Sequence, residues 1–108
     1  MPEWNAGKLG LSQKEISRFC QRWRIIEFAL FGSVLRDDFD AESDPDILVA
    51  FVQDADWSLL DHVQMEQELE ALLGRKVDLL SRRSVERSDN WLRRREILDT
   101  AEVVYASG

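Results

Sequence analysis

Cysteine and histidine are almost absent from this chain, with Cys20 and His62 as the single member of each type among 108 residues. One cysteine cannot form a disulfide within the chain, and one cysteine with one histidine cannot supply the ligands of a structural zinc site. Cys20 falls on the apolar face of an expected helix, so we interpret it as part of the core. Metal chemistry in this protein would therefore depend on oxygen ligands.

Positive charge is also scarce, because 14 lysine and arginine residues stand against 21 aspartate and glutamate residues, for a net charge of -7. Binding to nucleic acid without regard to sequence depends on lysine and arginine side chains that displace counterions from the phosphate backbone. We therefore expect no direct binding of nucleic acid.

Long apolar runs are missing as well. The first ten residues, "MPEWNAGKLG", contain no basic start followed by an apolar stretch, and no uninterrupted apolar segment approaches the length of a membrane helix. We expect a cytoplasmic protein that does not associate with membranes.

The residues that are present predict one small α/β or α+β domain over 1–108, since 44% hydrophobic content at this length suffices for one core and not for two. Ser12 and Glu15 have the spacing of a capping box at the start of a helix. Patterning then predicts helices at about 13–23, 57–73 and 91–98 and strands at 25–31, 46–52 and 76–81.

The remaining segments are assigned as follows. Residues 82–90 are expected to be a polar connector, and residues 102–106 either a strand or a packed tail. Gly74 is expected to end the second helix. On that helix we expect six apolar side chains to point inward, namely Leu59, Leu60, Val63, Leu69, Leu72 and Leu73.

Acidic residues enter one of these strands in an unusual way, in the segment "FGSVLRDDFDAESDPDILVAF" at 31–51. Asp44 and Asp46 are two residues apart, so on extended backbone their side chains point to the same side. Asp78 lies inside the apolar strand at 76–81. If the two strands are neighbours, three carboxylates converge, and their repulsion favours a bound cation such as Mg²⁺.

The start of the same segment has features of a phosphate-binding turn. Gly32 and Ser33 follow a strand and are expected to open a short helix, whose free amides attract anions. Arg36 can add a forked guanidinium group. Each feature also has an ordinary interpretation: a Gly-Ser pair as a simple turn, the Asp-x-Asp motif as solvated charge, and the strand aspartate as a structural cap. Their joint occurrence points to phosphate chemistry.

Taken in order, "GSVLR", "SDPDILVAF" and "KVDLL" resemble the pattern of the minimal nucleotidyltransferase (MNT) family, the small members of the polymerase β-like nucleotidyltransferase superfamily. The resemblance covers about residues 26–105. It implies the nucleotidyltransferase fold, a small mixed β-sheet flanked by helices. It also implies an enzyme that transfers a nucleoside monophosphate, AMP from ATP in the first instance, to a hydroxyl group of an acceptor.

The resemblance assigns roles to seven residues of this chain. Two Mg²⁺ ions would be held by the catalytic acids Asp44, Asp46 and Asp78, and Asp78 would also be placed to receive the proton of the acceptor. The nucleotide would be bound by Gly32, Ser33, Arg36 and Ser43. Two positions depart from the family pattern: Asp37 replaces the usual glycine, which adds negative charge near the triphosphate, and Pro45 replaces an aliphatic residue, which still suits the first residue of a strand.

Small members of this family commonly act as the antitoxin of a HEPN/MNT toxin-antitoxin pair, and some modify a tyrosine of the HEPN toxin. The resemblance therefore implies a HEPN-type toxin as partner, in a homo- or hetero-oligomer whose composition is left open. The acidic charge of this chain suits a basic partner. The alternative is a catalytically inactive binding module that neutralises its partner by direct contact.

Three consecutive arginines, Arg93, Arg94 and Arg95, lie on the last expected helix. We interpret them as a solvated face, with the alternative that one of them reaches the nucleotide or the partner. His62 is expected to be a surface residue without a catalytic role.

Overall fold

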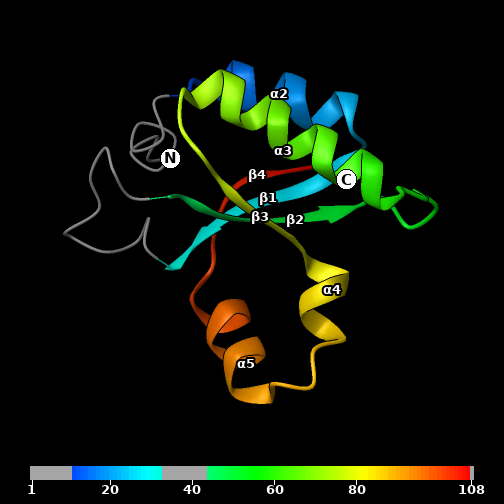
Figure 1. The fold of residues 1–108 in the computed structure, drawn as a ribbon, viewed down its shortest axis with the longest axis vertical. Coiled ribbons are helices and arrows are strands. Elements are labelled where there is room, and N and C mark those ends of the chain that lie inside the picture. Colours follow the sequence, from blue (N-terminus) through cyan, green and yellow to red (C-terminus); the bar gives the residue numbers. More distant parts are fainter. Residues whose placement is uncertain (1–10, 33–43, 108) are drawn as a thin grey trace.

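A four-stranded sheet with helices on both faces forms the molecule (Figure 1). The computed structural model describes residues 11–32 and 44–107. In chain order its elements are α2 (Gln13–Arg22), β1 (Ile25–Phe31), β2 (Asp46–Phe51), α3 (Leu59–Leu73), β3 (Asp78–Ser81), α4 (Arg82–Glu86), α5 (Trp91–Thr100) and β4 (Glu102–Ala106).

The strands lie in the order β3-β2-β1-β4, with β1 antiparallel to both β2 and β4 and with β2 parallel to β3. The sheet is thus mixed, as the family resemblance implies. Because β2 and β3 are parallel neighbours, the first residues of the two strands lie side by side. This arrangement pairs Asp46 with Asp78.

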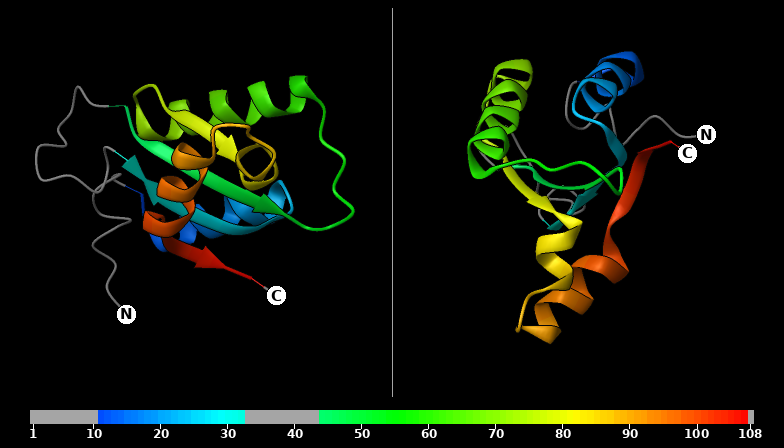
Figure 2. Two further views of the ribbon diagram at one scale, coloured as in Figure 1. Left: turned by 90° about the horizontal axis from the view of Figure 1, so that it is seen from below. Right: turned by 90° about the vertical axis from the view of Figure 1, so that its right-hand side faces the viewer.

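Each face of the sheet has its own apolar core. Figure 2 shows α2 and α3 on one side of the sheet and α4 and α5 on the other. The α2/α3 side is filled by residues that include Ile16, Phe19, Phe28, Leu30, Ile47, Val49, Met65, Leu69 and Leu79. The α4/α5 side is filled by Ala29, Phe31, Leu48, Val85 and Ile97. Side chains alternate between faces along a strand, so the even-numbered residues of β2 and β3, including Asp46 and Asp78, face α4 and α5.

The helix ends agree with the sequence. Ser12 and Glu15 form a capping box at the start of α2, and Ser58 and Asp61 form a second one at the start of α3. Gly74 ends α3 in the left-handed conformation with φ 70°. The segment at 102–106 is a strand and not a tail.

The prediction of six inward apolar side chains on α3 was right for Leu69, which is buried, and for Leu73, which packs against the core, and wrong for the other four. Leu59 and Leu60 are each 79% exposed, and Val63 and Leu72 are also exposed, whereas the buried residues of α3 are Met65 and Leu69. The reason is that α3 touches the sheet along one stripe only, and this stripe also contains polar residues that contact β3. Leucine content alone therefore overestimates the buried face.

The prediction of a plain connector at 82–90 was also wrong, because it contains the short helix α4. The Ser81 hydroxyl accepts a hydrogen bond from the Ser84 amide at 3.1 Å, and Val85 is buried against the sheet. One serine cap and one apolar contact are thus enough to form a helical turn here. In the described part of the chain, no helix has the length and apolar character needed to cross a membrane.

Candidate functional site

Two carboxylates meet at the start of the parallel strand pair. Asp46 and Asp78 are partners in the β2/β3 ladder, and their carboxyl groups lie within hydrogen-bonding reach of each other. The Asp78 amide donates a hydrogen bond of 2.9 Å to the carbonyl of Pro45, which fixes the register of the pair. The parallel sheet thus brings together two acids that are 32 positions apart in the sequence.

The electrostatics of this pair disfavour a second negative charge. The pKa of Asp78 is raised, first by partial burial and then by the charge and the hydrogen bond of Asp46, with a smaller contribution from Glu66. Arg93 acts in the opposite direction and lowers the pKa. Two opposed carboxylates in this situation either share a proton or attract a cation.

Gly32 lies against the Asp46 carboxylate at the end of β1. Phe31 is the ladder partner of Asp46, so the next residue reaches the Asp46 side chain. A Cβ atom at Gly32 would overlap Oδ2 of Asp46 and lie 3.1 Å from its Cγ atom, and Gly32 has φ +63°. Both the close approach and the left-handed backbone therefore require glycine at this position.

Of the seven residues predicted for the site, the structure brings Gly32, Asp46 and Asp78 together. Asp44 is exposed and precedes β2. Within 11–32 and 44–107, no three histidine, cysteine, aspartate or glutamate side chains form a group suited to a metal ion. Ser33, Arg36 and Ser43 lie outside the described residues, as does the short helix expected after Gly32.

The sequence of the chain matches a known protein family. The model of the family described as "Nucleotidyltransferase domain" matches residues 13–104. The chain belongs to the nucleotidyltransferase domain family.

This nucleotidyltransferase domain is also similar to individual proteins. It is 42% identical over 65 residues to the protein adenylyltransferase MntA of Thermococcus cleftensis, an alignment that covers 60% of this chain and 64% of the relative. This chain therefore spans less than two thirds of the length of that relative. A solved structure described as that of a minimal nucleotidyltransferase is 35% identical, with a TM-score of 0.63 and coverage of 82% of this chain and 85% of the other.

Two further solved structures are similar in fold. A toxin-antitoxin structure with AMP-PNP has a TM-score of 0.68 at 18% identity and covers 90% of this chain and 75% of the other. A structure of a tri-AMPylated HEPN toxin of Shewanella oneidensis in complex with an MNT antitoxin has a TM-score of 0.61 at 17% identity. This match covers 92% of this chain and 73% of the other. At these identities the likeness is one of fold.

The outer edge of β3 in the nucleotidyltransferase domain is covered by polar side chains of α3. His62 Nε2 lies 2.9 Å from the carbonyl oxygen of Leu79, and the Leu79 amide donates to Glu66 at 3.2 Å. One turn further, the Val77 amide donates to Glu70 at 3.4 Å. His62, which was predicted to be a surface residue, is half-buried and also contacts the backbone of β3, a contact that we did not predict from the sequence. The spacing of four residues between 62, 66 and 70 is the sequence signal for this polar stripe.

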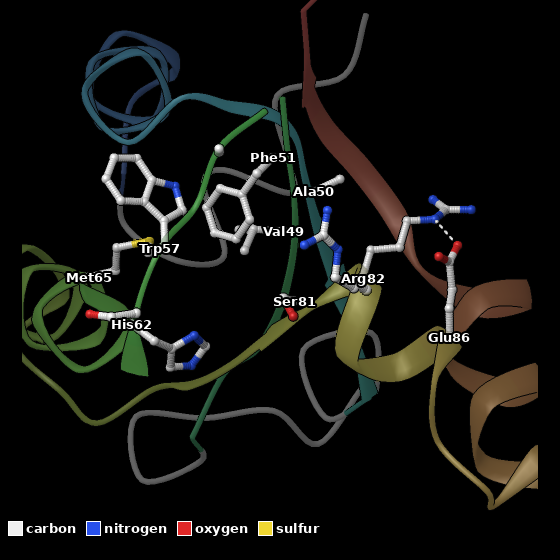
Figure 3. A pocket seen from close by; sticks show the side chains of 12 residues that line it. Val49, Ala50, Phe51, Trp57, His62, Met65, Ser81, Arg82 and Glu86 are labelled. Carbon is white, nitrogen blue, oxygen red and sulfur yellow. Dashed lines mark hydrogen bonds and ion pairs between the residues drawn. The ribbon is translucent and has the colours of Figure 1, made fainter. Parts of the chain in front are cut away.

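A cavity of about 310 Å³ lies at the other end of the same strands (Figure 3). Its apolar wall includes Val49, Phe51, Trp57 and Met65. Among its polar side chains, Arg82 already has partners, since it donates to Glu27 at 2.9 Å and to Glu86 at 3.1 Å. At about 3.3 Å per strand residue, this cavity is roughly 10 Å or more from Asp46. The acidic pair, and not the cavity, is the candidate site.

Proposed function

We propose that this protein is a Mg²⁺-dependent nucleotidyltransferase that transfers AMP from ATP to a tyrosine hydroxyl of a HEPN-type toxin and so acts as its antitoxin. The observation that carries the proposal is the Asp46/Asp78 pair with the backbone of Gly32 against it. A like-charged pair beside an exposed glycine turn suits a cation that is itself bound to a phosphate chain.

Asp46 and Asp78 fit the role of metal ligands, because their carboxyl groups already face each other and Asp46 disfavours the charge of Asp78. Asp44, which is exposed and lies just before β2, would bring its carboxylate to the metal as the third ligand. Bound Mg²⁺ would supply charge neutralisation for both the attacking oxygen and the departing pyrophosphate.

The side chains of this chain would mainly bind and orient the substrates. In the transfer, the acceptor oxygen forms a bond to the α-phosphorus, the bond from that phosphorus to the bridging oxygen breaks, and pyrophosphate leaves. The hydroxyl proton passes to Asp78. Gly32 leaves room for the phosphates, which Ser33, Arg36 and Ser43 would also contact. Such reactions depend chiefly on positioning and charge neutralisation.

The partner and the acceptor are supported by resemblance and by charge. The matched relative is named a protein adenylyltransferase, and one structural neighbour is a complex of an AMPylated HEPN toxin with an MNT antitoxin. The net charge of -7 would favour association with a basic partner. A cytoplasmic location stays a prediction from the sequence.

A transfer assay tests the proposal against the alternative of an inactive binding module. The protein is incubated with a HEPN-type toxin, Mg²⁺ and ATP labelled on the α-phosphate. We expect label on the toxin with the wild type and with Asp56→Asn, an exposed aspartate outside the site, and a loss of about 100-fold or more with Asp46→Asn.

Toxin that stays unlabelled but is still inhibited would reject the transferase and support the binding module. Label that survives in Asp46→Asn would place the chemistry elsewhere in the chain.

A further inference from the structure

The three consecutive arginines of α5 differ in what they contact. Arg94 donates to the carbonyl oxygen of Glu86 at 3.1 Å, and Arg95 forms an ion pair of 3.4 Å with Asp99. The guanidinium group of Arg93 makes no hydrogen bond or ion pair with any residue that the structure describes, although the Arg93 amide is capped by Asn90. Two of the three side chains are thus engaged with the protein itself, and Arg93 is available for a ligand.

Arg93 faces the same side of the sheet as the acidic pair. It lies four residues before the buried Ile97, so both are on the face of α5 that packs toward the sheet. Arg93 and Ile97 line a cavity of about 110 Å³ together with Leu80, which is two residues after Asp78 on β3 and points to the same face. Figure 1 shows α5 on this side of the sheet. The electrostatic effect of Arg93 on Asp78 agrees with this placement.

Helix stability does not explain an arginine at this position. Arg93 is in the first turn of α5, where the helix dipole disfavours positive charge, and no acidic residue lies in that turn. Arg93 is therefore a cation that its own helix disfavours, and it lies next to the candidate phosphate-binding site. This placement suits the binding of an anionic ligand.

We propose that Arg93 binds the phosphate groups of the nucleoside triphosphate at the Asp46/Asp78 site. This inference rests on the function proposed above. Gly32 approaches Asp46 from β1, whereas Arg93 approaches from the β3 side, so the phosphate chain is held from two directions. The guanidinium group is always charged and can donate two parallel hydrogen bonds to phosphate oxygens.

The test compares Arg93→Ala and Arg93→Lys with the control Arg95→Ala, in which an equally charged and exposed neighbour is removed. The Kd for Mg-ATP is measured by calorimetry, and KM is measured separately for ATP and for the protein acceptor. We expect Arg93→Ala to weaken ATP binding by about tenfold or more. Arg93→Lys recovers part of the affinity, and Arg95→Ala binds as the wild type does. The acceptor KM stays unchanged.

Equal ATP affinity in Arg93→Ala and Arg95→Ala would overturn the inference, and so would a change confined to the acceptor KM. The melting temperature of Arg93→Ala, which we expect to equal or exceed that of the wild type, excludes misfolding as the cause. The wild-type protein decides the proposed function separately: no binding of Mg-ATP by the wild type would overturn both proposals, whereas binding with no difference between variants would overturn only the role of Arg93.

Discussion

At the scale of single residues, the absence of a side chain at Gly32 matters to the site as much as the carboxylates do. Gly32 and Gly74 both have positive φ, at 63° and 70°, but a Cβ atom at Gly74 would meet nothing within 4 Å whereas one at Gly32 would overlap the Asp46 carboxylate. The two glycines therefore separate the cost of a left-handed backbone from the cost of displacing Asp46.

Replacement of each glycine by alanine should have different consequences. We expect Gly74→Ala to lower the free energy of unfolding by about 1 kcal/mol, from backbone strain alone, and to leave Mg-ATP binding unchanged. Gly32→Ala should lose at least as much stability and should also lose nucleotide binding. Chemical denaturation and calorimetry measure the two effects. Normal binding by Gly32→Ala would show that the contact with Asp46 is irrelevant to the site.

Asp78 provides a prediction on pH dependence without metal. Because burial and Asp46 raise its pKa in the folded state, the folded protein holds this proton more tightly than the unfolded chain does. Ionisation of Asp78 therefore costs stability as the pH rises above the ordinary aspartate pKa of about 4, and the cost is complete above the raised value. Asp78→Asn should accordingly melt at a higher temperature than the wild type at pH 7.

The gain should be a few degrees, since an exposed like-charge pair costs less than about 1 kcal/mol. It should disappear at pH values below the ordinary aspartate pKa of about 4, where Asp78 is protonated in both the folded and the unfolded chain. Asp56→Asn serves as the control and should show no such pH-dependent gain. A gain of the same size at acidic and neutral pH would contradict the like-charge explanation.

At the scale of elements, α3 protects the free edge of β3. Edge strands expose unpaired backbone groups that invite association with other strands. Here Glu66 and Glu70 accept from amides of this edge, and His62 meets the Leu79 carbonyl. The helix thus fixes the strand that carries Asp78.

Glu66 tests this role of α3. We expect Glu66→Ala to lower the free energy of unfolding by about 1 to 2 kcal/mol, because the Leu79 amide loses its acceptor in a partly buried position. Glu66→Gln keeps an acceptor oxygen and should lose clearly less. Urea denaturation monitored by circular dichroism provides the measurement. Equal losses in the two variants would mean that the charge of Glu66, and not its hydrogen bond, supports β3.

The success of sequence-based prediction varied between elements for physical reasons. The capping box at Ser12, the left-handed end at Gly74 and the apolar strands are local signals, and the structure agrees with them. The exposure of Leu59 and Leu60 depends on how α3 lies on the sheet, which no local pattern specifies. The contact of Gly32 with Asp46 likewise arises from pairing between strands.

At the scale of the whole molecule, the mixed sheet has its larger apolar core on one face and the candidate site on the other. The α2/α3 face holds the larger core, and the α4/α5 face carries Asp46 and Asp78 at the edge of a smaller one. The adjacency of β2 and β3 could be expected from the family resemblance. The placement of Arg93 next to the Asp46/Asp78 pair could not, because the position of α5 depends on the packing of Ile97 and on the preceding turn α4. The two acids thus come from β2 and β3, and the candidate phosphate-binding residues Gly32 and Arg93 come from the position after β1 and from α5.

The central claim is that Asp46 and Asp78 form a site for Mg²⁺ and a nucleoside triphosphate, and thermal denaturation with ligand tests it most directly. A ligand that binds only the folded state stabilises it by about 2.7 kcal/mol at 100 times its Kd. We predict that ATP with Mg²⁺ raises the melting temperature of the wild type and of Asp56→Asn, and leaves Asp46→Asn and Asp78→Asn unchanged. Equal shifts in all four proteins, or no shift in the wild type at millimolar Mg-ATP, would contradict the account.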